Sequence, residues 1–155
     1  MLPLDRRDFI ATLGGAAAVG LMSHEANHVF ISNGLGRAGT YAMNEGLASA
    51  LVSETHHAGG RQFLFPWTRD RRAQLRPLAE VFDNDKWKNL QQEIAYNSSA
   101  SFLAWLLDTY GSQRLRRIYG LSSRDLAATI ASVYGRSFES LEADWLRFCE
   151  TWPAQ

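Results

Sequence analysis

The chain has 155 residues, a length that favours a single domain with one buried core. Apolar residues make up 46% of it and charged residues 21%, which is typical of globular proteins and excludes disorder over most of the length. Sixteen Lys and Arg balance sixteen Asp and Glu, so a nucleic-acid-binding function is disfavoured. The only cysteine, Cys149, can form neither an internal disulfide nor a multi-thiolate metal site, so metal ligands must be histidines and carboxylates.

The N-terminal segment 1–22 has two interpretations. Arg6 and Arg7 precede an apolar run from Phe9 to Met22, an arrangement that resembles a twin-arginine export signal. The run is shorter than the roughly 20 residues that a helix needs to span a bilayer. In this interpretation the protein is exported, or associated with a membrane through residues 9–22, in a bacterium. In the other, residues 1–22 are the buried start of a core helix, and the protein is cytoplasmic.

The pattern predicts a first helix from Asp5 to about Ile31, largely buried and stopped by Asn33-Gly34. If its first half is core, one face packs against the later helices through Leu13, Ala17 and Leu21. Thr40 is expected to cap a second helix that runs to about Thr55. The G-x-G-x-x-G spelling of residues 34–39 follows a helix and not a strand, so a dinucleotide-binding loop is excluded.

Residues 58–70 are the least helical stretch, because Gly59-Gly60 and Pro66 interrupt them. Phe63, Phe65 and Trp67 alternate with other residues, which indicates either one short strand or a lid loop. A cluster of arginines surrounds this stretch and indicates either a solvated helix face or a surface that grips a substrate carboxylate or a membrane. The arginines are Arg61, Arg69, Arg71, Arg72 and Arg76.

The rest of the chain is predicted to be helical. A helical segment runs from Arg69 to Glu80, with Pro77 as its break, and Asp83 or Asn84 caps a short helix that follows. Residues 91–110 carry apolar side chains at the spacing of a packed helix, and Ser122 and Ser137 introduce two final helices. We therefore expect a mainly α, single helical domain with little or no β-sheet.

A metal-binding pattern lies in the first predicted helix. His24-Glu25-Ala26-Asn27-His28 reads H-E-x-x-H, and two histidines four residues apart share one helical face, so both imidazoles can reach one Zn²⁺. Glu25 then lies beside the metal, where it can take a proton from a zinc-activated water and pass it to the leaving amine. The alternative is that these are solvated polar residues of a helix.

A third ligand is needed for a catalytic zinc site, and Asn44-Glu45-Gly46-Leu47-Ala48 offers one early in the second helix. Together the two motifs resemble those of the gluzincin zinc metallopeptidases, whose second motif is N-E-G followed by a hydrophobic residue and Ala. The resemblance implies a Zn²⁺ ion held by His24, His28 and Glu45. His56 and His57 are alternative ligands, but their distance from Glu45 along the second helix favours surface histidines.

The resemblance covers residues 20–151, which are similar to the C-terminal helical part of peptidase MA-like domains. It implies that the Tyr96 hydroxyl donates a hydrogen bond to the oxyanion of the reaction, the alternative being a tyrosine of the core. Gluzincin domains usually place a β-sheet before the H-E-x-x-H helix, and its edge strand holds the peptide. The residues before His24 do not read as strands, so either Phe63–Trp67 supplies the edge or the chain is a reduced or truncated member.

These observations predict a zinc-dependent metallopeptidase that hydrolyses a peptide or protein substrate with Glu25 as general base. The alternative is a catalytically inactive or truncated zinc-binding helical protein, associated with a membrane through residues 9–22.

Overall fold

The computed structural model describes residues 15–52 and 60–153, and the side chains of residues 22–52 and 60–153. These residues form nine α-helices and one 3₁₀ helix, and none of them lies in a strand, so the expected mainly α fold is confirmed. The α-helices are α2 (Gly15–Leu35), α3 (Tyr41–Ala50), α4 (Arg61–Asp70), α5 (Leu78–Val81), α6 (Asn84–Trp87), α7 (Gln92–Tyr110), α8 (Ser112–Tyr119), α9 (Ser123–Tyr134) and α10 (Phe138–Thr151).

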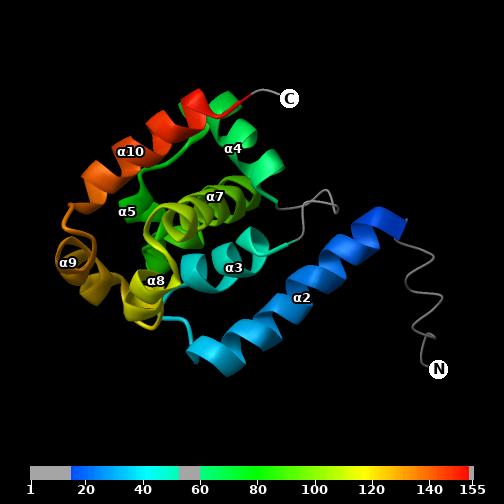
Figure 1. Cartoon of the computed structure of the whole chain (residues 1–155), viewed down its shortest axis with the longest axis horizontal. Coiled ribbons are helices and arrows are strands. Elements are labelled where there is room, and N and C mark those ends of the chain that lie inside the picture. Colours follow the sequence, from blue (N-terminus) through cyan, green and yellow to red (C-terminus); the bar gives the residue numbers. More distant parts are fainter. Residues whose placement is uncertain (1–14, 53–59, 154–155) are drawn as a thin grey trace.

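Helix α7 runs through the middle of the molecule, with α3 on one side of it and α4 on the other (Figure 1). Its side chains are buried along most of its length, and the Phe102 ring contacts those of Phe82, Phe138 and Trp145 at centroid distances of 5.7–6.0 Å. Such offset and edge-to-face aromatic contacts are favourable beyond the area they bury. Helix α7 is therefore the frame on which α3 is mounted.

The crossing of α3 and α7 is unusually close at one point. A Cβ atom on Gly46 would lie 2.8 Å from Ser99 Cβ and 2.9 Å from the Ser99 carbonyl carbon, so only glycine fits at this position. Ser99 directs its own hydroxyl to the carbonyl oxygens of Ala95 and Tyr96, within α7. This contact holds α3 at a fixed depth against the core.

Most helix starts agree with the sequence-based expectation. The side chains of Thr40, Asp83, Ser122 and Ser137 each accept a hydrogen bond from a backbone N–H in the first turn of the helix that follows. Gly111 ends α7 with a positive φ of 80°. Short polar side chains form these hydrogen bonds with backbone groups nearby in the chain, so helix starts of this kind can be predicted from the local sequence.

Helix α2 corrects two expectations. It ends at Leu35 and not near Ile31, because Gly36 adopts the left-handed conformation (φ 79°) that terminates a helix, and its N–H donates to the Ser32 carbonyl. The expected burial is also wrong for residues 22–35, where Val29 is 63% and Phe30 73% exposed. The proposed packing of Leu13, Ala17 and Leu21 lies outside the described side chains.

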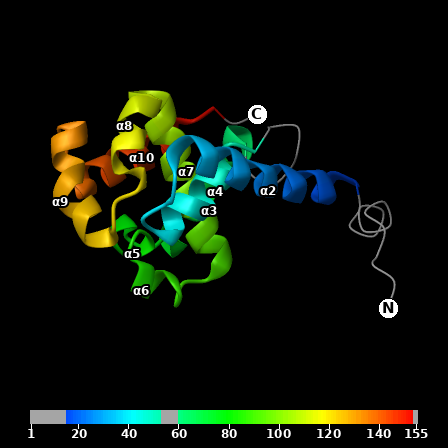
Figure 2. The same ribbon diagram turned by 90° about the horizontal axis from the view of Figure 1, so that it is seen from below.

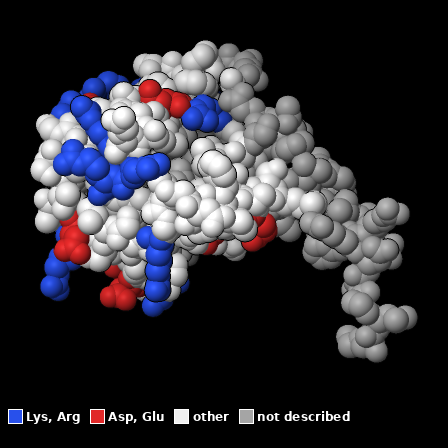
Figure 3. Space-filling view, turned by 60° about the horizontal axis from the view of Figure 1, so that its bottom comes forward, with Lys and Arg blue, Asp and Glu red and all other residues white. Residues whose placement is uncertain are grey.

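Helix α2 lies at the edge of the molecule, against α3, and its first turns extend beyond the rest of the helical body (Figures 1 and 2). In the face shown by Figure 3, most Lys and Arg side chains gather on one side of the described surface, and a largely uncharged surface lies beside them. Exposed apolar side chains of α2, Met22, Val29 and Phe30, lie outside the face that contacts α3. Among the described helices, none combines the length and the apolar character that crossing a membrane requires.

The expected strand or lid loop at residues 58–70 is wrong where the structure describes it. Residues 61–70 form α4, which starts after Gly60, and it buries Leu64, Phe65, Trp67 and Thr68 against α7 and α10. This packing holds the helix although Pro66 lies inside it and removes one backbone donor. Phe63–Trp67 therefore supplies no sheet edge.

Two further boundaries differ from expectation. The segment expected to be helical from Arg69 to Glu80 is broken into the end of α4, a 3₁₀ helix (Arg72–Gln74) and the short α5, which Pro77 precedes. Helix α3 ends at Ala50 and not near Thr55, and residues 53–59, with His56 and His57, lie outside the described residues.

The arginine cluster forms a solvated, ion-paired surface. Each of its arginines contacts a carboxylate in the following pairs: Arg61 with Asp108, Arg69 with Asp70, Arg71 with Glu93, Arg72 with Glu150, and Arg76 with Glu80. The carboxylates neutralise the charge that would be needed to grip a substrate, so the solvated-face interpretation is favoured.

Candidate metal centre

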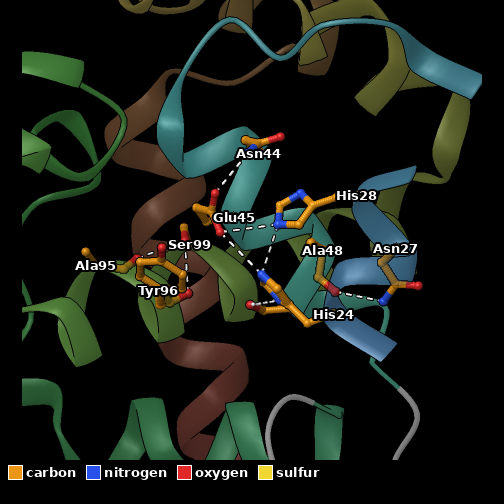
Figure 4. Close-up of polar contacts among 10 residues, drawn as sticks. His24, Asn27, His28, Asn44, Glu45, Ala48, Ala95, Tyr96 and Ser99 are labelled. Carbon is orange, nitrogen blue, oxygen red and sulfur yellow. Dashed lines mark hydrogen bonds and ion pairs between the residues drawn. The ribbon is translucent and has the colours of Figure 1, made fainter. Parts of the chain in front are cut away.

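Two histidines of α2 point toward α3. His24 and His28 are one helical turn apart, on the same face as Asn27 and Ile31. Ile31 is buried, and Asn27 Nδ2 donates a hydrogen bond of 2.9 Å to the Ala48 carbonyl oxygen of α3. These two contacts dock α2 on α3 and turn both imidazoles into the space between the helices (Figure 4).

Glu45 meets the two imidazoles from α3. Thr40 caps α3 by accepting from the Met43 N–H, which places Glu45 in the second turn, facing α2. His24 Nε2 lies 3.3 Å from Glu45 Oε2, His28 Nε2 lies 3.4 Å from the same oxygen, and the two Nε2 atoms are 3.0 Å apart. The structure thus brings together all three residues that the sequence singled out as ligands.

These distances fit one tetrahedral zinc ion. Ligand atoms that are each about 2.0–2.2 Å from a tetrahedral ion lie about 3.3–3.6 Å from one another. The three observed separations are close to that range, and in the described part of the chain no other group of three His, Cys, Asp or Glu side chains converges in this way. The side chains are 16%, 22% and 20% exposed, so solvent reaches the group from one side.

The charge of Glu45 is favoured in this setting. The hydrogen bond with His24 lowers the pKa of its carboxyl, with smaller lowering contributions from His28 and Asn44, and these outweigh the opposing effect of burial. An ionised carboxylate with two imidazoles is a ligand set typical of Zn²⁺.

Two polar side chains orient the candidate ligands and were missed by the sequence analysis. Asn44 Nδ2 donates to Glu45 Oε1 at 2.9 Å, and Ser49 Oγ lies 3.2 Å from His24 Nδ1 (Figure 4). The first contact leaves Glu45 Oε2 free to face the centre of the three ligands, and the second leaves His24 Nε2 free to do so. Partners of this kind fix the ring orientation and the basicity of metal ligands. A signal was present, since Asn44 and Ser49 lie one residue before and one turn after Glu45.

Tyr96 reaches the same site from α7. It lies on the other side of Glu45 from the imidazoles, with its ring against Trp87 at a centroid distance of 5.7 Å (Figure 4). Burial raises the pKa of its hydroxyl, and the charge of Glu45, a hydrogen bond with Glu45 and the charge of Glu25 raise it further. Glu25 is exposed, and it is near enough to Tyr96 for its charge to contribute to the raised pKa of the hydroxyl. Tyr96 is half-buried, so it is neither a fully enclosed core residue nor a surface one.

Comparison with known proteins gives no further guidance, because no protein-family model, no curated protein and no solved structure matches the chain. Three convergent ligand atoms, a neighbouring carboxylate and a tyrosine hydroxyl are groups that sites of metal-assisted hydrolysis can use.

Proposed function

We propose that this protein is a zinc-dependent metallopeptidase that hydrolyses peptide bonds. The observation that carries the proposal is the convergence of His24 Nε2, His28 Nε2 and Glu45 Oε2 at separations of 3.0–3.4 Å. Residues from two different helices meet there, and oriented partners hold two of the three. A chance cluster of surface polar groups has no reason to show that support.

The chain's own residues supply the remaining functions. Zinc, when bound, polarises a carbonyl oxygen and lowers the pKa of a water molecule. Glu25, next to a ligand and exposed to solvent, accepts a proton from the attacking water and returns it to the leaving amine. The Tyr96 hydroxyl is protonated at neutral pH, as a tyrosine hydroxyl ordinarily is, and its raised pKa extends that range, so it can donate a hydrogen bond to the developing oxyanion.

The decisive experiment separates metal binding from catalysis. We expect Glu25→Gln to retain one zinc per chain, measured by mass spectrometry of the metal, and to lose turnover of a peptide library by about 10²-fold to 10⁴-fold. Glu139→Gln removes an exposed carboxylate on α10 and should change neither quantity. A Glu25→Gln variant with full activity would contradict the assigned role of the base.

A second pair of variants, one of a candidate ligand and one of a neighbouring residue, tests the ligand assignment. His28→Ala should lose stoichiometric zinc, whereas Val29→Ala, a neighbouring change on the exposed face of the same helix, should keep it. Retention of zinc by His28→Ala would contradict the proposed site.

A second candidate is a zinc-binding helical protein without catalytic activity. It is favoured by one observation, that no described residue lies in a strand, so the described chain offers no sheet edge to hold an extended peptide. Wild-type protein that binds one zinc ion and hydrolyses no member of a broad peptide library would support this candidate over the peptidase.

The proposed location is outside the cytoplasm or at a membrane surface, and it is supported only by the sequence of residues 9–22. Cell fractionation together with the intact mass of the native protein tests it. A mature chain that starts at Met1 or Leu2 and stays in the cytoplasmic fraction would contradict it.

A further inference from the structure

A polar cavity of about 570 Å³ lies next to the candidate metal centre. It is formed where the connection between α2 and α3 meets the start of α6 and the connection between α8 and α9. Arg37, Tyr41, Asn44 and Asn84 line it, and none of its lining residues is an aspartate or a glutamate. A cavity with one cation and no anion among its walls favours a negatively charged ligand.

Arg37 is the residue that gives the cavity its charge. Unlike the ion-paired arginines near α4, Arg37 has no carboxylate within ion-pair distance in the part of the chain that is described. Its guanidinium can therefore offer two parallel N–H donors to a carboxylate, the geometry that arginine provides and lysine does not. The first turn of α3, which also borders the cavity, adds the positive end of a helix dipole.

The wall of the cavity is held rigidly by Asn84. Its Oδ1 accepts from the Tyr41 N–H at 2.8 Å, and its Nδ2 donates to the Gly39 carbonyl at 3.3 Å. Gly39 in turn donates to the Tyr119 carbonyl, and a Cβ on Gly39 would collide with the Leu121 carbonyl oxygen. The α2–α3 connection that carries Arg37 is therefore fixed to the end of α8.

Asn44 joins the cavity to the candidate metal centre. The residue lines the cavity while its Nδ2 bonds Glu45 Oε1, and it lies between the metal group and the α2–α3 connection (Figure 4). Tyr41, also in the wall, precedes Glu45 by one helical turn, a rise of about 5.4 Å to 6 Å along α3. Each residue of an extended peptide spans at most about 3.3–3.6 Å, so a peptide covers that length in about two residues.

We propose that this cavity binds the C-terminal carboxylate of a peptide substrate, with Arg37 as the residue that recognises it. The inference rests on the proposed peptidase function and deepens it. The scissile carbonyl lies at the metal centre and the free carboxylate in the cavity, about two residues further along the peptide. The protein then removes residues from the C-terminal end of peptides, and peptides with a blocked C-terminus are poor substrates.

Binding to the metal-free protein tests the cavity independently of catalysis. N-acetylglycine and its amide are titrated into ¹⁵N-labelled protein, and the side-chain amide signals of Asn44 and Asn84 are followed. We expect the acid to shift both signals and the amide to shift neither, while Asn89, outside the cavity lining, stays unchanged. Arg37→Gln should abolish the shifts, and Arg116→Gln, which removes an exposed arginine of α8, should preserve them.

Kinetics of the zinc-loaded protein give the second readout. For N-blocked tripeptides that differ only in a free or amidated C-terminus, we expect wild type to prefer the acid by about 10-fold to 100-fold in kcat/KM. Arg37→Gln should raise KM for the acid, leave kcat within about twofold and remove the preference, with zinc content unchanged. Arg116→Gln should behave as wild type.

The outcomes distinguish the two proposals. Hydrolysis without any preference for the free acid, or amide signals that respond equally to acid and amide, would overturn the assignment of the cavity and leave the peptidase function standing. Selective shifts by the acid without hydrolysis of any peptide would support the carboxylate site while overturning the peptidase function.

Discussion

Ser49 and Asn44 each hold one candidate ligand by an atom that does not face the metal position. Ser49 is 7% exposed and contacts His24 Nδ1, which leaves Nε2 directed at His28 and Glu45. An imidazole whose second nitrogen is fixed loses less rotational freedom when it binds a metal, so the orienting residues contribute to affinity without touching the ion.

Ser49→Ala therefore should weaken zinc binding by about 10-fold to 100-fold while leaving the fold intact, because alanine fits the space of serine. Titration against a chelator of known affinity measures the change. Ser132→Ala is the matched control, since Ser132 is exposed on α9 and its hydroxyl donates only to Thr129 of its own helix. Equal zinc affinity in the two variants would contradict the orienting role.

Cys149 is a second residue whose chemistry follows from its surroundings. It is fully buried on α10, with Ser101 Oγ 3.9 Å from its sulfur, and burial raises the pKa of its thiol from 9.0 to about 12. A raised pKa means that the folded chain holds the thiol proton more tightly than the unfolded chain. The associated stability is complete below pH 9 and is lost as the pH rises toward 12.

We expect the thiol of the native protein to resist Ellman's reagent at pH 8 to 9, because the reactive thiolate is scarce and the sulfur is enclosed. Unfolding in guanidinium should expose one reactive thiol per chain, which serves as the positive control. Rapid labelling of the folded chain would show that α10 opens locally.

The sequence predicted the candidate metal ligands better than it predicted the residues that orient them. The spacing of His24 and His28 fixes a shared helical face, and the N-E-G motif singled out Glu45. Asn44 and Ser49 lie close to Glu45 in the sequence, but the contacts of Asn27 with Ala48 and of Ser49 with His24 could not be read in the same way, because they depend on how α2 crosses α3. Crossing geometry is a property of side-chain packing between helices and leaves little trace in one sequence.

At the scale of elements, the crossing of α3 and α7 fixes the position of Glu45. The two helix backbones approach so closely at Gly46 and Ser99 that the position tolerates no side chain. A larger residue must push α3 outward, and Glu45, the preceding residue, must move with it. Stability and metal binding are therefore coupled through Gly46.

Gly46→Ala should lower the free energy of unfolding by about 1–3 kcal/mol, since the clash with Ser99 outweighs the better helix propensity of alanine. Gly34→Ala is the control, because Gly34 lies in α2 with nothing within 4 Å of its added Cβ. That change should be neutral or stabilising by up to about 1 kcal/mol. Guanidinium unfolding curves measure both, and a stabilised Gly46→Ala would contradict the packing argument.

The starts of helices were more predictable from the sequence than their ends, and α4 was not predicted at all. N-cap serines, threonines and aspartates act through local hydrogen bonds, and the expected caps at Thr40, Asp83, Ser122 and Ser137 are confirmed. Helix α4 was missed because glycine and proline argue locally against a helix. Burial of Leu64, Phe65, Trp67 and Thr68 against α7 and α10 overrides that preference. The apolar pattern of ten residues does not show which other helices they will pack against, so it could not predict this helix.

At the scale of the whole molecule, the candidate ligands join an edge helix to the core. Helix α2 packs mainly on α3, and most of its described side chains remain exposed or half-buried. A metal ion held by His24, His28 and Glu45 would cross-link α2 to the rest of the fold. A ligand that binds only the folded state stabilises it in proportion to the logarithm of its concentration.

Zinc at 100 times its dissociation constant should therefore stabilise the protein by about 2.7 kcal/mol, which corresponds to a rise in Tm of about 5–10 °C for a chain of this size. Differential scanning fluorimetry with zinc and with EDTA measures the shift. Val29→Ala should show the same rise as wild type, and His28→Ala should show none. An equal rise in His28→Ala would place the stabilising metal elsewhere.

The short separation of the candidate ligands along the sequence has a consequence for the order of folding. His24 and Glu45 are 21 residues apart, whereas the core contact of α3 with α7 joins residues 46 and 99. Closing the shorter loop costs less chain entropy, so the α2–turn–α3 hairpin can form before α7 docks. A metal ion that arrived at that stage would meet its ligands in a partly folded chain, and its capture would then precede the assembly of the core.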